Sequence, residues 1–175
     1  MRRVGVVLAL LLLAHCASDR VVRSTQLPLA VSVAPPFRHA GSQTFVLRGN
    51  AEVEQHLFFD PEARRIVWIQ YERYLPGVDE EYAYDSGMTV QIGGVDFDVS
   101  TREYQAPPDP GSDRDYAFRL LAAKGFRLGE PATRVRFVHV PAGDRRSELM
   151  IIYAESGTRA EGLLDRARAS FTIVR

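Results

Sequence analysis

The feature that most constrains the fold of this chain is a series of strand-like runs that begins near Leu27 and continues to the C-terminus. The runs are rich in β-branched and aromatic residues, and many alternate between apolar and polar side chains with the period of two that half-buried strands show. Most of the chain is therefore predicted to be β-sheet. In order, the runs are LPLAVSVA, TFVLRG, VEQHLFF, RIVWIQYERYL, MTVQIGG, VDFDVSTREY, TRVRFVHV, ELMIIYA and SFTIV.

Turn signals between neighbouring runs predict that consecutive strands pair in antiparallel fashion. Pro61 fits the second position of a turn between the third and fourth runs, and the side chain of Asp60 can cap that turn. Gly93 and Gly94 separate MTVQI from VDFDV, and a two-glycine connection favours a tight hairpin.

Two amphipathic helices are predicted among the strands. Ser112 and Asp115 form a capping signal before an apolar pattern over 116–124, and Gly125 is a suitable C-terminal cap. A second helix repeats this arrangement near the C-terminus, with Thr158 and Glu161 as its cap and an apolar stripe made of Ala160, Leu163, Leu164 and Ala167.

Many strands with only two helices indicate an α+β fold, in which a twisted, mainly antiparallel sheet carries the helices packed on it. The late order of helix, two strands, helix and strand is similar to that of the Mog1/PsbP-like fold. A single domain over 27–175 is expected, because a chain of about 150 residues can bury about two thirds of the surface that it exposes when unfolded.

The N-terminus has the pattern of a secretory signal. Arg2 and Arg3 precede an apolar segment, Val4 to Ala14, that is too short to span a bilayer comfortably. The tetrapeptide that ends at Cys16, Leu-Ala-His-Cys, resembles the lipobox of bacterial lipoproteins, although His15 replaces the small residue that usually precedes the cysteine. This resemblance implies a signal peptide over 1–15 and a lipid on the Cys16 thiol.

Two other features of this region bear on localisation. Residues 16–26 are polar after the cysteine and are expected to form a flexible, lipid-anchored tether. The absence of Asp at position 17 implies outer-membrane anchoring facing the periplasm. The alternative is ordinary cleavage that leaves Asp19 as the new N-terminus, which would discard Cys16 and give a soluble periplasmic or secreted protein.

Charge and motifs exclude several functional classes. Removal of Arg2 and Arg3 leaves 20 basic against 22 acidic residues, a balance that argues against nucleic-acid binding. The chain has no nucleophile elbow, P-loop or dinucleotide fingerprint. The histidines of the expected domain, His39, His56 and His139, lie in separate elements, so no metal site and no cofactor are predicted.

The best candidate site is the acidic and tyrosine-rich segment 71–85. Carboxylates beside tyrosines can bind a sugar or hold a cation, and paired carboxylates can divide the acid and base roles of glycoside hydrolysis. The structural alternative is that the tyrosines pack on the sheet while the acids face water. The candidate ligand-binding residues are Tyr71, Glu72, Tyr74, Asp79, Glu80, Glu81, Tyr82, Tyr84 and Asp85.

These observations favour an envelope-associated lipoprotein that acts as a noncatalytic binding or accessory module. Its expected partners are the membrane, through the lipid, and an envelope protein or a small polar ligand. One alternative is a periplasmic hydrolase that uses two of the acids Glu72, Glu80, Glu81 and Asp85. Another is a secreted, soluble assembly or interaction factor that offers a sheet edge or an apolar groove to its partner.

Overall fold

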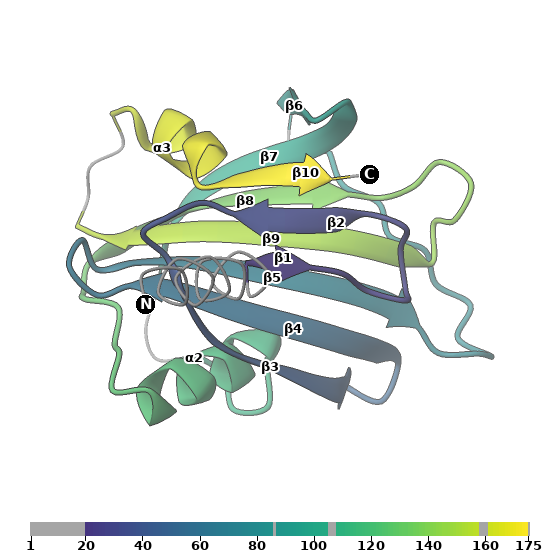
Figure 1. Cartoon of the computed structure of the whole chain (residues 1–175). Helices are drawn as coiled ribbons and strands as arrows, with labels where there is room; N and C mark the ends of the chain where they lie inside the picture. Colours follow the sequence, from purple (N-terminus) through teal and green to yellow (C-terminus); the bar gives the residue numbers. More distant parts are fainter. Residues whose placement is uncertain (1–19, 86, 105–107, 158–160, 175) are drawn as a thin grey trace, which may run out of the picture.

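The computed structural model describes residues 20–85, 87–104, 108–157 and 161–174, and over these ranges the chain forms ten strands and two helices (Figure 1). Seven strands make one antiparallel sheet in the order β3-β4-β5-β9-β8-β7-β6. The predicted α+β class is therefore confirmed. The strands of this sheet are β3 (Arg38–Leu47), β4 (Ala51–Asp60), β5 (Arg65–Tyr74), β6 (Thr89–Ile92), β7 (Val95–Tyr104), β8 (Ala132–His139) and β9 (Ser147–Ser156).

A second, smaller sheet covers one face of the large one. It consists of β1 (Val21–Val22), β2 (Ala30–Val33) and β10 (Phe171–Val174) in the order β1-β2-β10. The helix α3 (Leu163–Ala169) lies beside it, and both pack on the large sheet (Figure 1). The ring of Phe171 meets that of Phe137 edge to face, with 5.3 Å between centroids, so aromatic packing joins the two sheets.

The opposite face of the large sheet is covered by the helix α2 (Asp113–Ala123). Its buried residues Ala117 and Leu121 contact a second apolar cluster that includes Trp68, Ile152 and Leu57. Trp68 is 1% exposed, as expected for a large ring at the centre of a covered strand. Each face of the sheet therefore has its own core.

Local signals in the sequence locate the two predicted hairpins correctly. Asp60 Oδ1 accepts hydrogen bonds from the amides of Glu62 and Ala63, at 3.1 and 3.2 Å, and the turn joins β4 to β5. Gly93 and Gly94, both with positive φ, connect β6 to β7. The left-handed conformation that both positions adopt is one that glycine reaches without strain.

The first predicted helix is also confirmed. The Ser112 hydroxyl accepts a hydrogen bond from the Asp115 amide at 3.2 Å, and Gly125 follows the helix with a φ of +73°. The second helix, α3, begins later than expected, at Leu163, after Gly162 with a φ of +65° and no side-chain cap. The predicted capping residue Thr158 and the first stripe residue Ala160 lie outside the described residues.

The segment predicted to be a tether differs from that expectation. Val21 and Val22 form β1, which pairs with β2, and Val22, Gln26 and Leu27 are buried. A two-residue strand is too short to produce a periodic pattern, so the sequence carries no signal for it. The folded body thus includes residues from Arg20 onward, whereas the signal peptide and Cys16 lie outside the described residues.

Candidate functional site

The candidate segment leaves β5 at Tyr74 and is held against the chain just before β9. The Arg146 guanidinium donates to the carbonyls of Leu75, at 2.9 Å, and Val78. The Tyr82 amide donates to the Arg145 carbonyl at 2.8 Å, and the Arg145 side chain donates back to the Tyr82 carbonyl at 2.9 Å. Arginines that follow β8 therefore fix residues 75–82 beside the start of β9.

At this position two glutamates face each other inside the protein. Glu72 on β5 is the direct cross-strand partner of Glu148 on β9, and both side chains lie on the face that carries Trp68 and α2. Glu72 is 8% exposed and Glu148 only 2% exposed. The Glu72 carboxyl accepts hydrogen bonds from the Tyr82 hydroxyl and the Gln70 amide, both at 2.8 Å.

Burial makes this pair a weak acid. It raises the pKa of Glu148 to about 8; a hydrogen bond from Tyr84 opposes part of this effect of burial, and the nearby Glu72 carboxylate adds a smaller increase. Burial also raises the pKa of Glu72, while hydrogen bonds from Tyr82 and Gln70 lower it. Because two adjacent carboxylates in a dry site repel each other, the pair retains a proton at neutral pH.

A chain of glutamines extends from the acid pair to the edge of the sheet. Gln70 lies beside Gln55, whose side-chain amide donates to it at 3.2 Å, and Gln43 donates to Gln55 at 2.6 Å. Trp68 Nε1 donates to Gln70 at 3.2 Å, and Gln55 also donates to the backbone carbonyl of Asp113 at the start of α2, at 3.1 Å. This network satisfies most of the polar groups under α2 and fixes the carboxyl of Glu72.

Two buried polar atoms, one on the acid pair and one on a neighbouring arginine, have no hydrogen-bond partner among the described residues. They are Glu148 Oε2 and Arg136 Nε. The Arg136 guanidinium carbon lies 5.1 Å from the centre of the Tyr84 ring, which places the cation over the aromatic face. Unsatisfied buried groups of this kind cost stability, and such groups are more common at functional sites than in ordinary cores.

The structure divides the predicted site residues into three groups. Glu72, Tyr74, Tyr82 and Tyr84 come together, and the rings of Tyr74 and Tyr82 stack with 4.3 Å between centroids. Tyr71 points to the other face of the sheet, where its hydroxyl donates to the Leu29 carbonyl at 2.8 Å. The remaining residues are exposed acids, namely Asp79, Glu80, Glu81 and Asp85.

Sequence reasoning missed Glu148, Gln70 and Arg136. Glu148 precedes the apolar run LMIIYA, where a glutamate looks like the polar end of a strand. Only the pairing of β5 with β9, which are far apart in the sequence, places it opposite Glu72. Gln70 and Arg136 occupy alternating strand positions that are normally taken to face water.

An open pocket of about 600 Å³ lies on the other side of the tyrosines. One wall is formed by Tyr82, Ala83 and Tyr84, and neither Glu72 nor Glu148 lines the pocket. The facing wall comes from the start of β7 and the end of β8, and it includes Val95, Asp96, Phe97, Asp98, Val138, His139 and Val140. The exposed ion pair of Arg145 with Glu81, at 3.0 Å, lies at its rim.

The polar groups of this pocket are partly fixed in position. One ring nitrogen of His139, Nδ1, lies 3.0 Å from the Asp96 carbonyl, and the ring packs at 5.8 Å from Phe97. Gln91 donates to the Asp96 carboxylate at 3.1 Å. The pocket therefore combines carboxylates, an imidazole and aromatic surface, a set that suits a small polar ligand.

The other histidines do not join this pocket. His39 and His56 stack at 6.4 Å on adjacent strands, and His56 Nε2 lies 2.8 Å from Glu54. No group of three or more histidine, cysteine or acidic side chains is arranged to hold a metal ion within the ranges that the structure covers. In the same ranges, the helices are too short or too polar to cross a membrane.

Comparison with known proteins gives no relative. No family model, no curated protein and no solved structure matches this chain. The similarity in element order to the Mog1/PsbP-like fold, and the resemblance of the N-terminus to a lipoprotein signal, therefore stay predictions.

Proposed function

We propose that this protein is an exported lipoprotein of the cell envelope, anchored through Cys16, and that it binds a small polar ligand without catalysing a reaction. The observation that carries the binding function is the pocket of about 600 Å³ between the Tyr82–Tyr84 wall and the Asp96–His139 wall. A site of this size and composition fits a ligand with hydroxyl or ammonium groups, because carboxylates accept hydrogen bonds and aromatic rings stack on sugars or attract cations.

The distribution of acids supports binding over hydrolysis. A glycosidase needs two carboxyl groups that reach the same bond from opposite sides of an accessible cleft. Here Glu72 is enclosed under Tyr82, whereas Glu80, Glu81 and Asp85 are exposed on a surface segment. The buried partner of Glu72 is Glu148, and both belong to the support behind the tyrosine wall.

The acid pair, Glu72 and Glu148, holds the tyrosine wall of the pocket in position. Glu72 accepts a hydrogen bond from Tyr82, and Glu148 interacts with Tyr84. The two tyrosines therefore connect the pocket to the rigid centre of the sheet. A rigid wall favours binding, since less conformational freedom is lost when a ligand enters.

Removal of the proposed lipid anchor is expected to move the protein from the membrane fraction to the soluble fraction. Native protein should carry an acylated N-terminal cysteine and fractionate with membranes, and Cys16→Ala should move the protein to the soluble fraction or block its processing. Intact mass spectrometry of the native protein, with the variant fractionated in parallel, measures both effects. An unmodified N-terminus near Asp19 in soluble wild-type protein would contradict the anchor and leave the secreted alternative.

Filling the pocket with a large side chain is expected to weaken ligand binding. Ala83 is exposed and lines the pocket, so Ala83→Trp should weaken binding at least about tenfold without disturbing the core. The matched control is Ala63→Trp, which adds the same side chain at an exposed turn between β4 and β5. Native mass spectrometry of protein from its own envelope, and thermal-shift titration with sugars, amino acids and organic ammonium compounds, measure binding.

Two results would reject the pocket. One is equal binding to the Ala83→Trp variant and its control. The other is native protein without any bound small molecule, together with no thermal shift from the compounds tested.

A further inference from the structure

The outer edge of β3 is available for pairing. β3 is the first strand of the seven-stranded sheet, and β4 is its sheet neighbour (Figure 1). Among the described residues, no hydrogen bond joins the backbone of Ser42–Val46 to a group outside β4. Alternate N–H and C=O groups of an edge strand point away from the sheet, so this stretch presents a row of free donors and acceptors.

This edge lacks the usual protection against pairing. Natural edge strands are blunted by charged residues, prolines or bulges, or are kept very short. Residues Ala40–Leu47, AGSQTFVL, contain no charge and no proline, and the bulge of β3 is confined to the stretch between His39 and Gly41. The opposite edge of the sheet, β6, has only four residues and follows the usual pattern.

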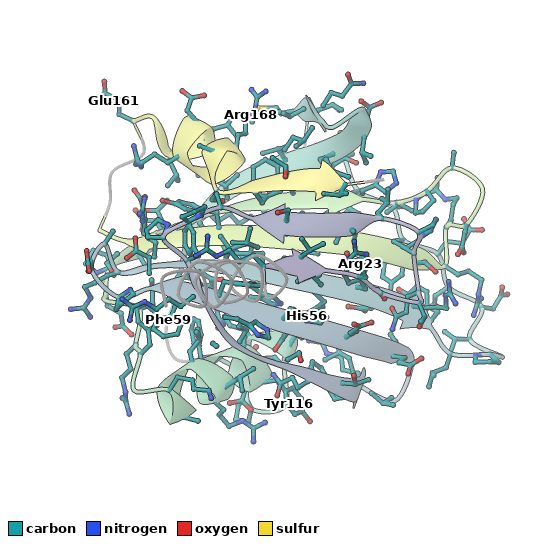
Figure 2. The ribbon with its side chains drawn as sticks, in the orientation of Figure 1. Arg23, His56, Phe59, Tyr116, Glu161 and Arg168 are labelled. Carbon is teal, nitrogen blue, oxygen red and sulfur yellow. The ribbon has the colours of Figure 1, made fainter. Side chains whose placement is uncertain are left out.

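The two faces beside the edge differ in character. Ser42, Thr44 and Val46 are exposed on one face, and Val46 is 51% exposed. On the other face Phe45 stacks on Tyr116 of α2 with 4.0 Å between ring centroids. Figure 2 labels Tyr116 on this helix. An added strand would therefore place alternate side chains against an apolar shelf made of Phe45 and Tyr116 and leave the others in water.

Positive charges flank this neutral stretch. Arg38 begins β3 and Arg48 follows its last residue, and both are exposed. We propose that the β3 edge binds an extended segment of a partner protein that is apolar in its middle and acidic at both ends. The segment would extend the sheet by one strand of about eight residues, or roughly 27 Å at about 3.4 Å per residue.

A second copy of this chain fits the edge less well than such a partner. Symmetric antiparallel pairing over the full strand would place Arg38 of one copy opposite Arg48 of the other, at both ends of the pair. Like charges directly opposite each other destabilise a strand pair, whereas acidic ends attract these arginines. This inference does not depend on the pocket, which is lined by residues of other segments.

The test uses a nine-residue peptide of alternating valine and threonine with glutamate at each end, compared with the same peptide carrying lysine at each end. Amide shifts and hydrogen exchange of the purified protein report binding at β3. We expect new protection of those amides within Ser42–Val46 that point away from β4, and about fivefold tighter binding of the glutamate peptide, since each exposed ion pair contributes little. The preference should shrink in high salt.

Charge reversal gives the decisive comparison. The double variant Arg38→Glu with Arg48→Glu should prefer the lysine peptide, whereas Arg102→Glu with Arg127→Glu, at exposed positions in other segments, should keep the original preference. Three outcomes would overturn the proposal: no protection of β3 by the glutamate peptide, the same peptide preference in both double variants, or a concentration-dependent dimer that itself protects the β3 amides.

Discussion

Replacing Glu148 with glutamine is expected to stabilise the protein in alkaline solution by up to about 5 kcal/mol and to leave its stability near pH 4 almost unchanged. The native environment raises the pKa of Glu148 to about 8, from an ordinary value of 4.5, mainly because the side chain is buried. Between these two pH values, therefore, the folded state keeps a proton on Glu148 that the unfolded chain has already released.

The direction of the pH effect on stability follows from this difference in the pKa of Glu148 between the folded and unfolded states. Below pH 4.5 the carboxyl is protonated in both states and burial of the neutral acid costs little. As the pH rises toward 8, the unfolded state gains stability by ionising, so the free energy of unfolding of the parent falls by up to about 1.4 kcal/mol per pH unit. Glutamine has no proton to lose, so the variant lacks this decline.

Urea unfolding followed by circular dichroism at pH 4, 6, 7.5 and 9 measures the effect. The control is Glu103→Gln, which makes the same change at an exposed position on β7 and should retain the pH slope of the parent. Parallel curves for the parent and Glu148→Gln would show that the buried carboxyl is ionised throughout this range and would reject the protonated pair.

Trp68→Ala is expected to cost about 3–5 kcal/mol of unfolding free energy. The ring is 1% exposed and fills the cluster between the large sheet and α2. Its removal leaves a cavity, and it also takes a hydrogen-bond donor from Gln70, which is fully buried. Both losses act in the same direction, since an apolar void and an under-satisfied amide each destabilise the folded state.

The measurement again uses urea unfolding by circular dichroism, because Trp68 is the single tryptophan and its fluorescence is lost in the variant. Val46→Thr, at a position that is 51% exposed, should change stability by less than about 0.5 kcal/mol and serves as the control. A cost below about 1 kcal/mol for Trp68→Ala would mean that α2 does not pack tightly on the sheet.

The parts of the fold that depend on neighbouring residues could be predicted from the sequence. The β4–β5 turn at Asp60, the Gly93–Gly94 hairpin and the Ser112 cap all act within a few residues of chain. The insertion of β9 between β5 and β8 depends on contacts between distant segments, which leave no local signal. β1 escaped prediction for a different reason, because two residues cannot display a period.

The difference between local signals and contacts between distant segments also explains which residues of the site could be predicted. Tyrosines and acids close together in the sequence identified Glu72, Tyr74, Tyr82 and Tyr84, which the structure brings together. Glu148 became visible only through its pairing with Glu72. The pocket walls formed by Asp96, Asp98 and His139 come from strands whose alternation is compatible with an ordinary wet face, so composition could not distinguish them from surface residues.

The strand order has a consequence for the export that we propose. The central strand of the large sheet is β9, which pairs with β5 and β8, and the small sheet is completed by β10, so the core stays open until the last thirty or so residues are present. A polypeptide that crosses a membrane with its N-terminus first would thus arrive largely unfolded and close its core only on release of its final strand. Such a delay keeps the chain unfolded enough to be transported, and it leaves the open edge of β5 dependent on the prompt arrival of β9 to avoid aggregation.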